Sequence, residues 1–314
     1  MNIWKPLSTF LFRRKPDERE EKLSTVQISP LLTVANPANK ELEQTRPLVI
    51  VDVGCRWGFA EKFTKKAGRF RIFGFDPDQE ECIRLSRFYQ DASITLVPLG
   101  LAMGPGKRTL YVTKEPACSS LLEPDPVLTK SYPALSCAKH IRSIEVETTT
   151  LDAWARDAHV EAVDYLKIDT QGTELEILMG GAEILRSVRC LEVEVEFNPI
   201  YLGQPVFSDV DAFLRRQGFV LWKLANQVHY SSSGSPVGPM GEESVFYDDR
   251  YQVRHEIYGG QLYWANACYV RKDVLQPEAA SDRQISLDVA LFTTLGMPDV
   301  VQHVLDSQNR VTRQ

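Results

Sequence analysis

The sequence predicts an α/β fold built on a parallel sheet, and three observations predict it. Residues 48–53 form a short apolar run rich in β-branched side chains, which is typical of a strand buried on both faces. Residues 163–168 form a second run of this kind, and an Asp follows it. Strand-like and helix-like segments alternate between and after these runs, as expected for right-handed βαβ units.

The first strand leads into a predicted helix. Phe59, Phe63 and Ala67 are spaced four residues apart and would share one helix face, and Gly68 would end that helix. The next strand is predicted at residues 71–75. A helix and a third strand should follow it, because the apolar pattern changes again from a helical to an extended period.

That helix is predicted at 78–88, and the third strand at 94–101. An additional strand is expected at 108–113. Residues 115–138 are rich in Pro and predict a long loop with a short helix, placed over the active face of the sheet. Residues 144–148 alternate as a strand does, before a short helix.

Thr150 can cap that short helix, which would run through Trp154. Predicted strands and helices then alternate to the end of the chain. The strands are expected at 190–197, 219–224 and 262–271, and the helices at about 175–185, 208–217 and 285–305. A loop rich in Gly, Ser and Pro is expected at 231–241, between the last two strands.

Composition limits the class of protein. Apolar residues make up 43% and charged residues 25% of the 314, which fits a soluble globular protein. The net charge of -6 argues against nucleic-acid binding, which needs a positive field. No apolar run approaches the ~20 residues that span a bilayer. The six cysteines form no CxxC pair and no signal peptide is evident, so we expect reduced thiols in a cytoplasmic protein.

Three regions are expected along the chain. Residues 1–46 would be a partly disordered leader or linker, 47–275 the main domain, and 276–314 a helical extension. Residues 1–15 carry four positive charges, no acid and several apolar side chains, so the leader could contact a membrane surface peripherally. The alternative is a disordered or loosely docked leader. The sequence does not indicate an oligomeric state.

The stretch VIVDVGCRWG, at residues 49–58, predicts a ligand site at the end of the first strand. In open parallel sheets, ligands bind outside the carboxyl ends of the strands, near the point where the strand order reverses. Gly54 and Gly58 leave the backbone free to approach a ligand, and Asp52 adds a negative charge. Asp76 ends the next strand and suits two ribose hydroxyls, with a helix N-cap as its alternative role.

The spacing of the two glycines restricts the class of ligand that the loop can bind. A dinucleotide requires GxGxxG around its pyrophosphate, whereas this loop reads GxxxG with Arg56 and Trp57 inside it. We therefore expect a nucleoside without a pyrophosphate. S-adenosylmethionine fits, because Asp52 and other acids nearby favour its ammonium and sulfonium groups. The alternative is an NAD-linked oxidoreductase or another nucleotide-binding enzyme, and the missing third glycine disfavours it.

Acidic residues at the ends of two later strands are the candidates for catalysis. Asp169 could neutralise the cofactor ammonium or accept a substrate proton, and its alternative role is to cap the following helix. Glu196 is the second candidate base, with a buried ion pair to Lys167 as its alternative. His140, expected in a loop, is a third candidate because it could move over the site. The Cys/His spacing of a zinc site is missing, and we predict no metal site.

The succession of motifs resembles one family. The segments DVGCRWG, FGFDPD, VPLGLA, ETTTLDAW, VDYLKIDTQGTELEIL and VEVEFNPIYLGQPVFSDVDAFLRRQGF are similar to those of the FkbM-type S-adenosylmethionine-dependent methyltransferases. The resemblance implies a Rossmann-like class I methyltransferase fold, with a seven-stranded, mostly parallel sheet, helices on both faces and a final antiparallel strand. It also implies O-methylation of a hydroxyl on a sugar, glycan or polyketide-type natural product.

The resemblance implies a role for each matched residue. The residues implied to bind the cofactor are Asp52, Gly54, Gly58, Asp76, Gly100, Leu101 and Asp169. The first three would hold the methionine part and the fourth the ribose hydroxyls. The next two would line the adenine, and strand-end packing is their alternative role.

One departure from the family pattern stands out. Where the family has Asp-Val-Gly-Ala-Asn-x-Gly, this chain has Cys55, Arg56 and Trp57 between the glycines. The Asp and both glycines are retained, so cofactor binding is still expected. If the bulky Arg56 and Trp57 face the substrate, the methyl acceptor could also be an anionic group or a group that stacks on an aromatic ring. The alternative function is a non-catalytic binding or scaffold protein, in which these two side chains fill the cofactor site.

Overall fold

The computed structural model describes residues 46–65, 68–248 and 251–311. Leu48–Lys272 forms one compact unit, and the residues from Asp273 onwards belong to a second unit. The predicted membrane contact of residues 1–15 lies outside the described residues. In the part of the chain that the structure describes, no helix is long and apolar enough to cross a membrane.

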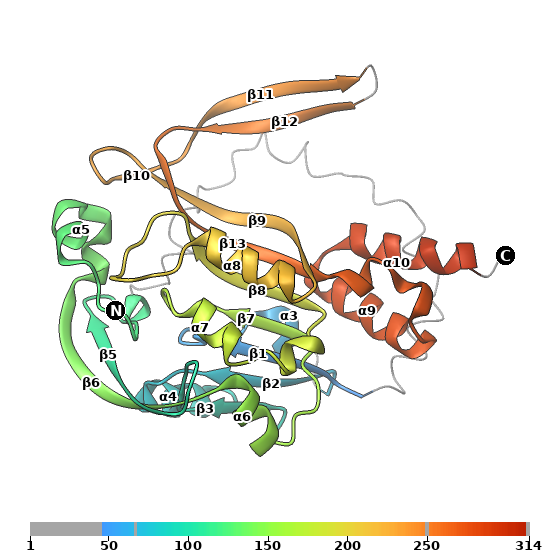
Figure 1. Cartoon of the computed structure of the whole chain (residues 1–314), viewed down its shortest axis with the longest axis horizontal. Helices are drawn as coiled ribbons and strands as arrows, with labels where there is room; N and C mark the ends of the chain where they lie inside the picture. The colour runs from blue at the N-terminus through green and yellow to red at the C-terminus, as the bar shows by residue number, and fades with distance from the viewer. Residues whose placement is uncertain (1–45, 66–67, 249–250, 312–314) are drawn as a thin grey trace. The chain divides into compact units, whose positions relative to one another are not determined.

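The larger unit is built on an eight-stranded sheet with the order β10-β9-β13-β8-β7-β1-β2-β3 (Figure 1). Its strands are β1 (Leu48–Val53), β2 (Phe70–Phe75), β3 (Ile94–Val97), β7 (Tyr165–Ile168), β8 (Cys190–Glu196), β9 (Phe219–Tyr230), β10 (Pro236–Val237) and β13 (Gln261–Arg271). The strands from β8 to β3 pair in parallel, and β13 is antiparallel to both of its neighbours. The predicted seven-stranded class I arrangement is confirmed, and the two-residue β10 extends its edge.

The strand order reverses between β1 and β7. From β1 the sheet grows towards β2 and β3, whereas from β7 it grows towards β8. Val53 at the end of β1 pairs with Phe75 on one side and with Ile168 on the other. Asp76 and Asp169 each follow one of these partners directly, so the two acids flank the end of β1, where this type of sheet binds ligands.

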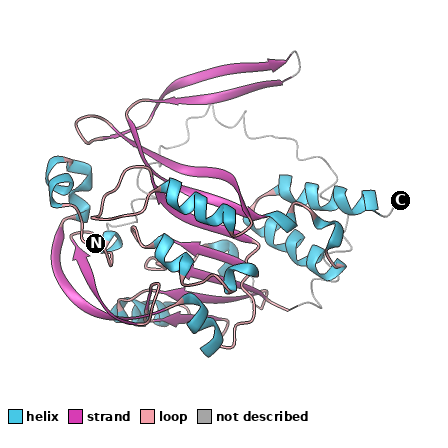
Figure 2. Cartoon of the chain, viewed as in Figure 1, coloured by secondary structure: helices cyan, strands magenta, loops and turns pink. Residues whose placement is uncertain are grey.

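Helices cover both faces of the sheet, as predicted (Figures 1 and 2). One face packs α6 (Leu151–Asp157), α7 (Glu174–Met179) and α8 (Phe207–Arg216) against the buried side chains of the central strands. On the other face lie α3 (Glu61–Thr64) and α4 (Gln79–Phe88), and Phe63 of α3 contacts Tyr165 of β7. All six residues of β1 are buried, because both faces of this central strand are covered.

Two predicted helices are shorter than expected. The helix after β1 was expected to reach residue 67, but α3 ends at Thr64. The helix after β7 was expected to continue to about residue 185, but α7 ends at Met179, and a separate 3₁₀ turn, η5, follows at Ile184–Arg186. Two adjacent glycines, Gly180 and Gly181, separate the two pieces, and glycine weakens a helix interior.

The predicted third strand divides between two sheets. β3 ends at Val97, and β4 (Gly100–Leu101) pairs with β6 (His140–Thr149) in a three-stranded sheet completed by β5 (Gly106–Thr113). Pro98 lies at the division and has no N–H for a sheet ladder.

The connection between β5 and β6 contains the predicted short helix. Its elements are η3 (Pro116–Cys118), α5 (Pro126–Ser131) and η4 (Pro133–Ala138). They pack in a separate apolar cluster with residues that include Ile200, Tyr201 and Tyr263. We call residues 114–139 the lid segment, because its first part lines the cavity described below.

A hairpin of β11 (Pro239–Asp248) and β12 (Tyr251–Tyr258) forms a third sheet, which the sequence did not predict. The predicted loop at 231–241 covers only the start of β11, and the alternation of Tyr251, Val253 and Ile257 with polar residues was the signal that could have found β12. In the second unit, α9 (Asp282–Leu295) and α10 (Pro298–Val311) correspond to the predicted terminal helices, and η6 (Lys272–Val274) and η7 (Pro277–Ala279) precede them.

Candidate functional site

A cavity opens at the carboxyl ends of β1, β2 and β7. Its empty space is about 740 Å³, including the part that is open to solvent. The walls come from the β1–α3 loop, the end of β2, the segment from β3 to β4, the start of the lid segment and the β7–α7 loop. The cavity therefore lies at the point where the strand order reverses, which is the predicted position.

Gly54 lets two of these loops meet. Its φ is +85°, and a Cβ at this position would lie 1.9 Å from the carbonyl oxygen of Asp169. Any side chain here would separate the β1 and β7 loops, so this glycine is required by close approach. Its amide is already in use, because Gly54 N and Cys55 N both donate to the Phe75 carbonyl oxygen, at 2.9 and 3.0 Å. The cavity lining includes Gly54.

Gly58 has a packing role in the structure. Its φ is +90°, and a Cβ would lie 2.4 Å from the hydroxyl oxygen of Tyr89. That hydroxyl oxygen accepts a hydrogen bond from Phe59 N at 3.0 Å, and Gly58 N donates to the Cys55 carbonyl oxygen. Gly58 is outside the cavity lining. The second glycine of the motif was expected to hold the cofactor, but here it makes room for an aromatic side chain from the end of α4.

Asp52 is buried beside the cavity and does not line it. Lys167 Nζ lies 3.3 Å from Asp52 Oδ1 and 3.6 Å from Asp169 Oδ2, so one ammonium group joins the two carboxylates. Burial raises the pKa of Asp52, and Lys167 opposes that shift. The ion pair expected between Lys167 and Glu196 is wrong, because the Lys167 side chain pairs with the acids of β1 and of the β7 end.

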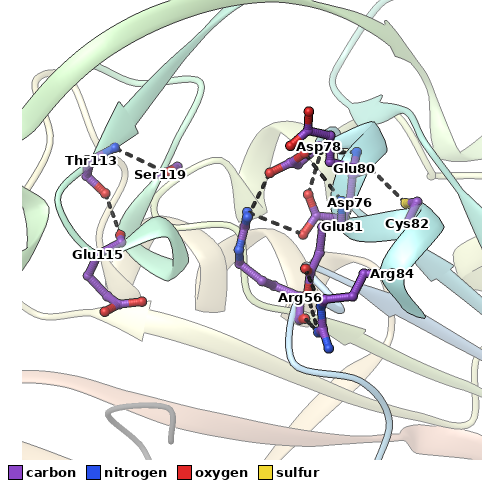
Figure 3. A network of polar contacts seen from close by, with 10 residues as sticks. All are labelled: Arg56, Asp76, Asp78, Glu80, Glu81, Cys82, Arg84, Thr113, Glu115 and Ser119. Carbon is purple, nitrogen blue, oxygen red and sulfur yellow. Dashed lines mark hydrogen bonds and ion pairs between the residues drawn. The ribbon is translucent and has the colours of Figure 1, made fainter. Parts of the chain in front are cut away.

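Asp76 lines the cavity, and two groups fix its side chain (Figure 3). Its Oδ1 accepts a hydrogen bond from Asp78 N at 2.8 Å, and Arg56 Nη1 lies 3.9 Å from its Oδ2. Burial raises the pKa of Asp76 to about 6, with Arg56 acting in the opposite direction. The N-cap of α4 is Asp78, which accepts from Glu80 N and Glu81 N. Asp76 is thus left facing the cavity.

Gly100 and Leu101 also line the cavity, and both are buried. They form β4, where Gly100 pairs with Thr148 and Leu101 with Thr149. A Cβ on Gly100 would lie 3.0 Å from Thr148 Cγ2, so strand packing restricts this position as well. Cavity lining and strand-end packing, the two roles expected for these residues, therefore occur together.

Asp169 lines the cavity and is held by a residue in a rare conformation. Gln171 has a φ of +62°, and its Nε2 donates to Asp169 Oδ1 at 3.1 Å and to Glu194 Oε2 at 2.5 Å. The hydroxyl oxygen of Tyr201 lies 3.2 Å from Gln171 Oε1, and Ser120 Oγ of the lid segment donates to the Gln171 carbonyl oxygen at 2.7 Å. Gln171 therefore joins the lid segment to the acids of β7 and β8.

The same region contains a tyrosine that sequence reasoning missed. Tyr201 is buried, and its hydroxyl oxygen lies 2.7 Å from the carbonyl oxygen of Cys118 in the lid segment. No local pattern distinguishes this residue, because its partners come from distant parts of the chain.

Glu196 does not reach the cavity. It is buried at the end of β8 and lies outside the cavity lining. Burial raises its pKa well above the ordinary value, and the nearby charges of Glu174 and Asp169 raise it further. Burial has the same effect on the pKa of Glu194. Its position away from the cavity lining leaves its expected role as a base without a contact to the site.

His140 is also away from the cavity. It is the first residue of β6 and not part of a loop, so the predicted position is wrong. Its side chain is exposed, its Nε2 lies 3.0 Å from Ser143 Oγ, and its ring contacts Tyr111. The β-ladder with β5 fixes this part of the chain, so His140 has no loop in which to move over the site.

Among the described residues, no group of three or more His, Cys, Asp or Glu side chains is arranged to hold a metal ion. The carboxylates at the ends of β7 and β8 contact amide groups and a lysine: Glu174 Oε1 accepts from Thr170 N at 2.8 Å, Glu194 from the Gln171 side chain, and Asp169 lies beside Lys167.

Comparison with known proteins identifies the family. The methyltransferase FkbM domain matches residues 37–221, more than half of the chain. The chain belongs to the FkbM methyltransferase family. It is similar to the 2-O-methyltransferase NoeI of Sinorhizobium fredii, with 26% identity over 168 residues, covering 52% of this chain and 69% of that relative.

Solved structures are more distant. Methyltransferase FkbM from Methylobacillus flagellatus KT is 14% identical with a TM-score of 0.39, and the match covers 72% of this chain and 44% of that one. The magnesium protoporphyrin IX methyltransferase ChlM from Synechocystis PCC 6803, solved with bound SAM, is 11% identical with a TM-score of 0.32, covering 75% and 78%. The fold assignment therefore follows from the strand order of the sheet and not from these two structures.

Proposed function

We propose that the protein is an S-adenosylmethionine-dependent O-methyltransferase. The observation that carries the proposal is the cavity at the reversal point of the sheet, where Asp76 and Asp169 face the same space from the two strands beside β1. The acceptor is proposed to be a hydroxyl of a sugar, a glycan or a polyketide-type natural product. The printed name of the NoeI relative, a 2-O-methyltransferase, supports transfer to oxygen.

The residues that line the cavity fit this cofactor. Asp76 offers a carboxylate to hydroxyl donors, and Leu99, Leu101 and Phe75 supply apolar surface suited to a flat base. The Asp169 carboxylate would attract the positively charged part. The amides of Gly54 and Cys55 would not take part, because both already donate to Phe75. S-adenosylmethionine supplies a methyl group that its sulfonium already activates.

Asp169 is the proposed proton acceptor. Lys167 Nζ lies 3.6 Å from Asp169 Oδ2 and Gln171 Nε2 donates to Asp169 Oδ1 at 3.1 Å, so contacts to both oxygens fix the side chain at the cavity wall. General-base assistance of this kind typically contributes 10²–10⁴-fold. The other contribution is positioning, in which Ser119, Ser120 and the rest of the lid wall would hold the acceptor and exclude water.

The lid segment is well anchored at its start (Figure 3). Thr113 N donates to Ser119 Oγ at 3.2 Å, and Thr113 Oγ1 donates to the Glu115 carbonyl oxygen at 2.6 Å. With the bond from Ser120 to Gln171, this part of the wall is held from both β5 and the β7–α7 loop. Such anchoring supports a preformed acceptor site.

A calorimetric titration with S-adenosylmethionine and S-adenosylhomocysteine tests the proposal. We expect saturable binding of both compounds. The absence of binding at millimolar cofactor would instead favour the scaffold function, in which Arg56 and Trp57 fill the site. The acceptor would then be sought by mass spectrometry of metabolites and glycans from cells with and without the protein, as a species that lacks one methyl group.

The Asp169→Asn variant tests the role of the base. Because the amide keeps the shape of the side chain but cannot accept the proton, we expect turnover to fall by about 10²-fold or more. Cofactor affinity should change less than turnover. Equal losses in both quantities would assign Asp169 to binding alone.

A further inference from the structure

We propose that Arg56 is a positioning residue that keeps the Asp76 carboxylate charged and aimed into the cavity, and so sets the acidity range in which the site binds its cofactor. The proposal rests on the proposed function, because the donors that Asp76 would accept are the ribose hydroxyls of the cofactor. Arg56, which departs from the family motif, would then support cofactor binding. In the scaffold alternative, Arg56 would instead fill the cofactor site.

The geometry leaves Asp76 open to a ligand. Arg56 Nη2 lies 2.7 Å from Asp78 Oδ2, which is a short charge-assisted contact, whereas Arg56 Nη1 lies 3.9 Å from Asp76 Oδ2. The second distance is too long for a hydrogen bond but short enough for a strong charge effect. Asp78 therefore binds the guanidinium group, and Asp76 Oδ2 keeps its capacity to accept hydrogen bonds.

A second arginine fixes the backbone of the same loop (Figure 3). Arg84 Nη2 donates to the Arg56 carbonyl oxygen at 3.2 Å, and Arg84 also makes two bonds to the Glu81 carboxylate, at 2.6 and 2.7 Å. Asp78 at the N-cap of α4 and Arg84 within α4 thus hold the side chain and the backbone of Arg56. The Arg56 side chain is 18% exposed, so it is positioned and not free to leave.

The charges around Asp76 explain why a cation is needed there. Burial is the largest influence and raises the pKa of Asp76, and the acids Asp78 and Glu81 raise it further. Arg56 and the bond from Asp78 N lower it, which leaves the value at about 6. The thiols of Cys55 and Cys82 lie nearby, and Cys82 Sγ donates to the backbone carbonyl oxygen of Asp76 at 3.3 Å; burial raises the pKa of both thiols.

Removal of the guanidinium charge should therefore move Asp76 towards its protonated form near neutral pH. A protonated carboxyl group has lost part of its acceptor capacity and its negative charge, so it would bind two hydroxyl donors less well. An opposite charge within ~4–6 Å typically lowers a carboxyl pKa by about 1–3 units. The loss of Arg56 should raise the pKa of Asp76 by about one unit or more.

The test is a series of S-adenosylhomocysteine titrations by calorimetry, from about pH 5 to about pH 8.5, with the full-length chain. For the wild type, affinity should fall as the pH drops through about 6, where Asp76 takes up a proton. For Arg56→Gln, the fall should begin about one pH unit higher, so binding should be about twofold weaker at about pH 7 and about fivefold weaker at about pH 6. Arg56→Lys keeps the charge and should stay near the wild-type profile.

Arg71→Gln is the matched control. Arg71 is exposed at the opposite end of β2, the strand that Asp76 follows, so this variant loses one positive charge without touching the site. Its profile should superimpose on that of the wild type. Melting curves without ligand should show that the Arg56→Gln chain is folded.

A measurement without ligand separates this inference from the proposed function. The difference in unfolding free energy between each parent and its Asp76→Asn derivative reports the titration of Asp76. A carboxyl with a raised pKa in the folded state costs stability as the pH rises from about 4 to about 6, and in the Arg56→Gln background this loss should extend about one unit higher. An unchanged range would overturn the inference, even if the cofactor binds.

Two results of the titrations would also overturn it. One is an Arg56→Gln profile that superimposes on the wild type, and the other is tighter binding by Arg56→Gln at every pH, which would make Arg56 a competitor of the ligand. If no chain binds the cofactor but the ligand-free titration of Asp76 shifts as expected, the proposed function fails and the electrostatic role of Arg56 stands.

Discussion

Two acidic groups lie at the same edge of the sheet and differ in how their charge is balanced. The β2 cluster consists of Arg56, Asp76 and Asp78, and the β7–β8 cluster consists of Asp169, Gln171, Glu174, Glu194 and Glu196. In the β2 cluster, one arginine lies between two carboxylates. The β7–β8 cluster has four carboxyl groups; the Gln171 amide contacts Asp169 and Glu194, and the Lys167 ammonium group contacts Asp169.

A position at the end of a strand does not by itself make an acid a ligand-binding group. Asp76 and Asp169 face the cavity and each has a cation within 4 Å. Glu194 and Glu196 lie one strand further away, are buried among other acids, and burial raises the pKa of each. The position of the carboxyl group at the cavity wall, with a cation nearby, distinguishes Asp76 and Asp169 from the acids buried further along the sheet.

The largest effect is expected where the two clusters are joined, at Gly54. The Gly54→Ala variant would force a Cβ against the Asp169 carbonyl oxygen at a positive φ. We expect it to lower the unfolding free energy by about 3 kcal/mol or more and to abolish cofactor binding. Urea unfolding and calorimetry measure both quantities.

Gly104→Ala is the control for this variant. A Cβ at Gly104 would meet no atom within 4 Å, and no positive φ is required there. It should change stability by less than about 1 kcal/mol. Equal stability of the two variants would show that the ends of β1 and β7 do not depend on the close approach of Gly54 to Asp169. Gly54 would then not connect the two clusters.

The second largest effect is expected in the β2 cluster, and it concerns the affinity for the cofactor. Asp76→Asn removes the charge from the open carboxylate, so S-adenosylhomocysteine affinity should fall by about 10–100-fold at neutral pH, in line with the value of hydrogen bonds to charged groups. The unfolding free energy should not fall, because burial disfavours the charged Asp76 carboxylate in the folded state and the variant removes that charge. Glu80→Gln, at an exposed position of the same helix start, should leave the affinity unchanged.

A smaller effect is expected in the β7–β8 cluster, and it concerns stability. Because burial raises the pKa of Glu196, the folded state holds a proton that the unfolded chain releases, and stability declines as the pH rises above about 4.5. Glu196→Gln should flatten this decline by up to about 1.4 kcal/mol per pH unit without loss of stability near neutral pH. Denaturant unfolding as a function of pH measures it, and exposed Glu161→Gln should not alter the slope.

The smallest effect is expected outside both clusters. His140→Ala removes an exposed side chain whose hydrogen bond joins neighbouring residues of one strand. Turnover and cofactor affinity should each stay within about twofold of the wild type, because surface substitutions usually change free energies by less than ~0.5 kcal/mol. A large loss of turnover alone would return His140 to the list of catalytic candidates.

The parallel sheet and the edge at which the candidate site lies could be predicted from the amino-acid sequence. Buried runs at 48–53 and 163–168, each associated with an Asp, predicted parallel central strands, and parallel strands end at one edge. The positions of Asp76 and Asp169 beside the cavity follow from this rule, since each is the first residue after its strand. Strand periodicity is a local property, so local sequence was sufficient.

The contacts of each side chain at that edge could not be predicted in this way, because they depend on how distant segments fold together. Gly58 packs on Tyr89, Asp52 pairs with Lys167, and Glu196 is closed off behind other acids. These partners are 31 and 115 residues away in the first two cases, and no spacing rule connects them. The charge state of an acid depends on its burial and on the cations that folding brings close to it. The amino-acid sequence shows neither of these directly.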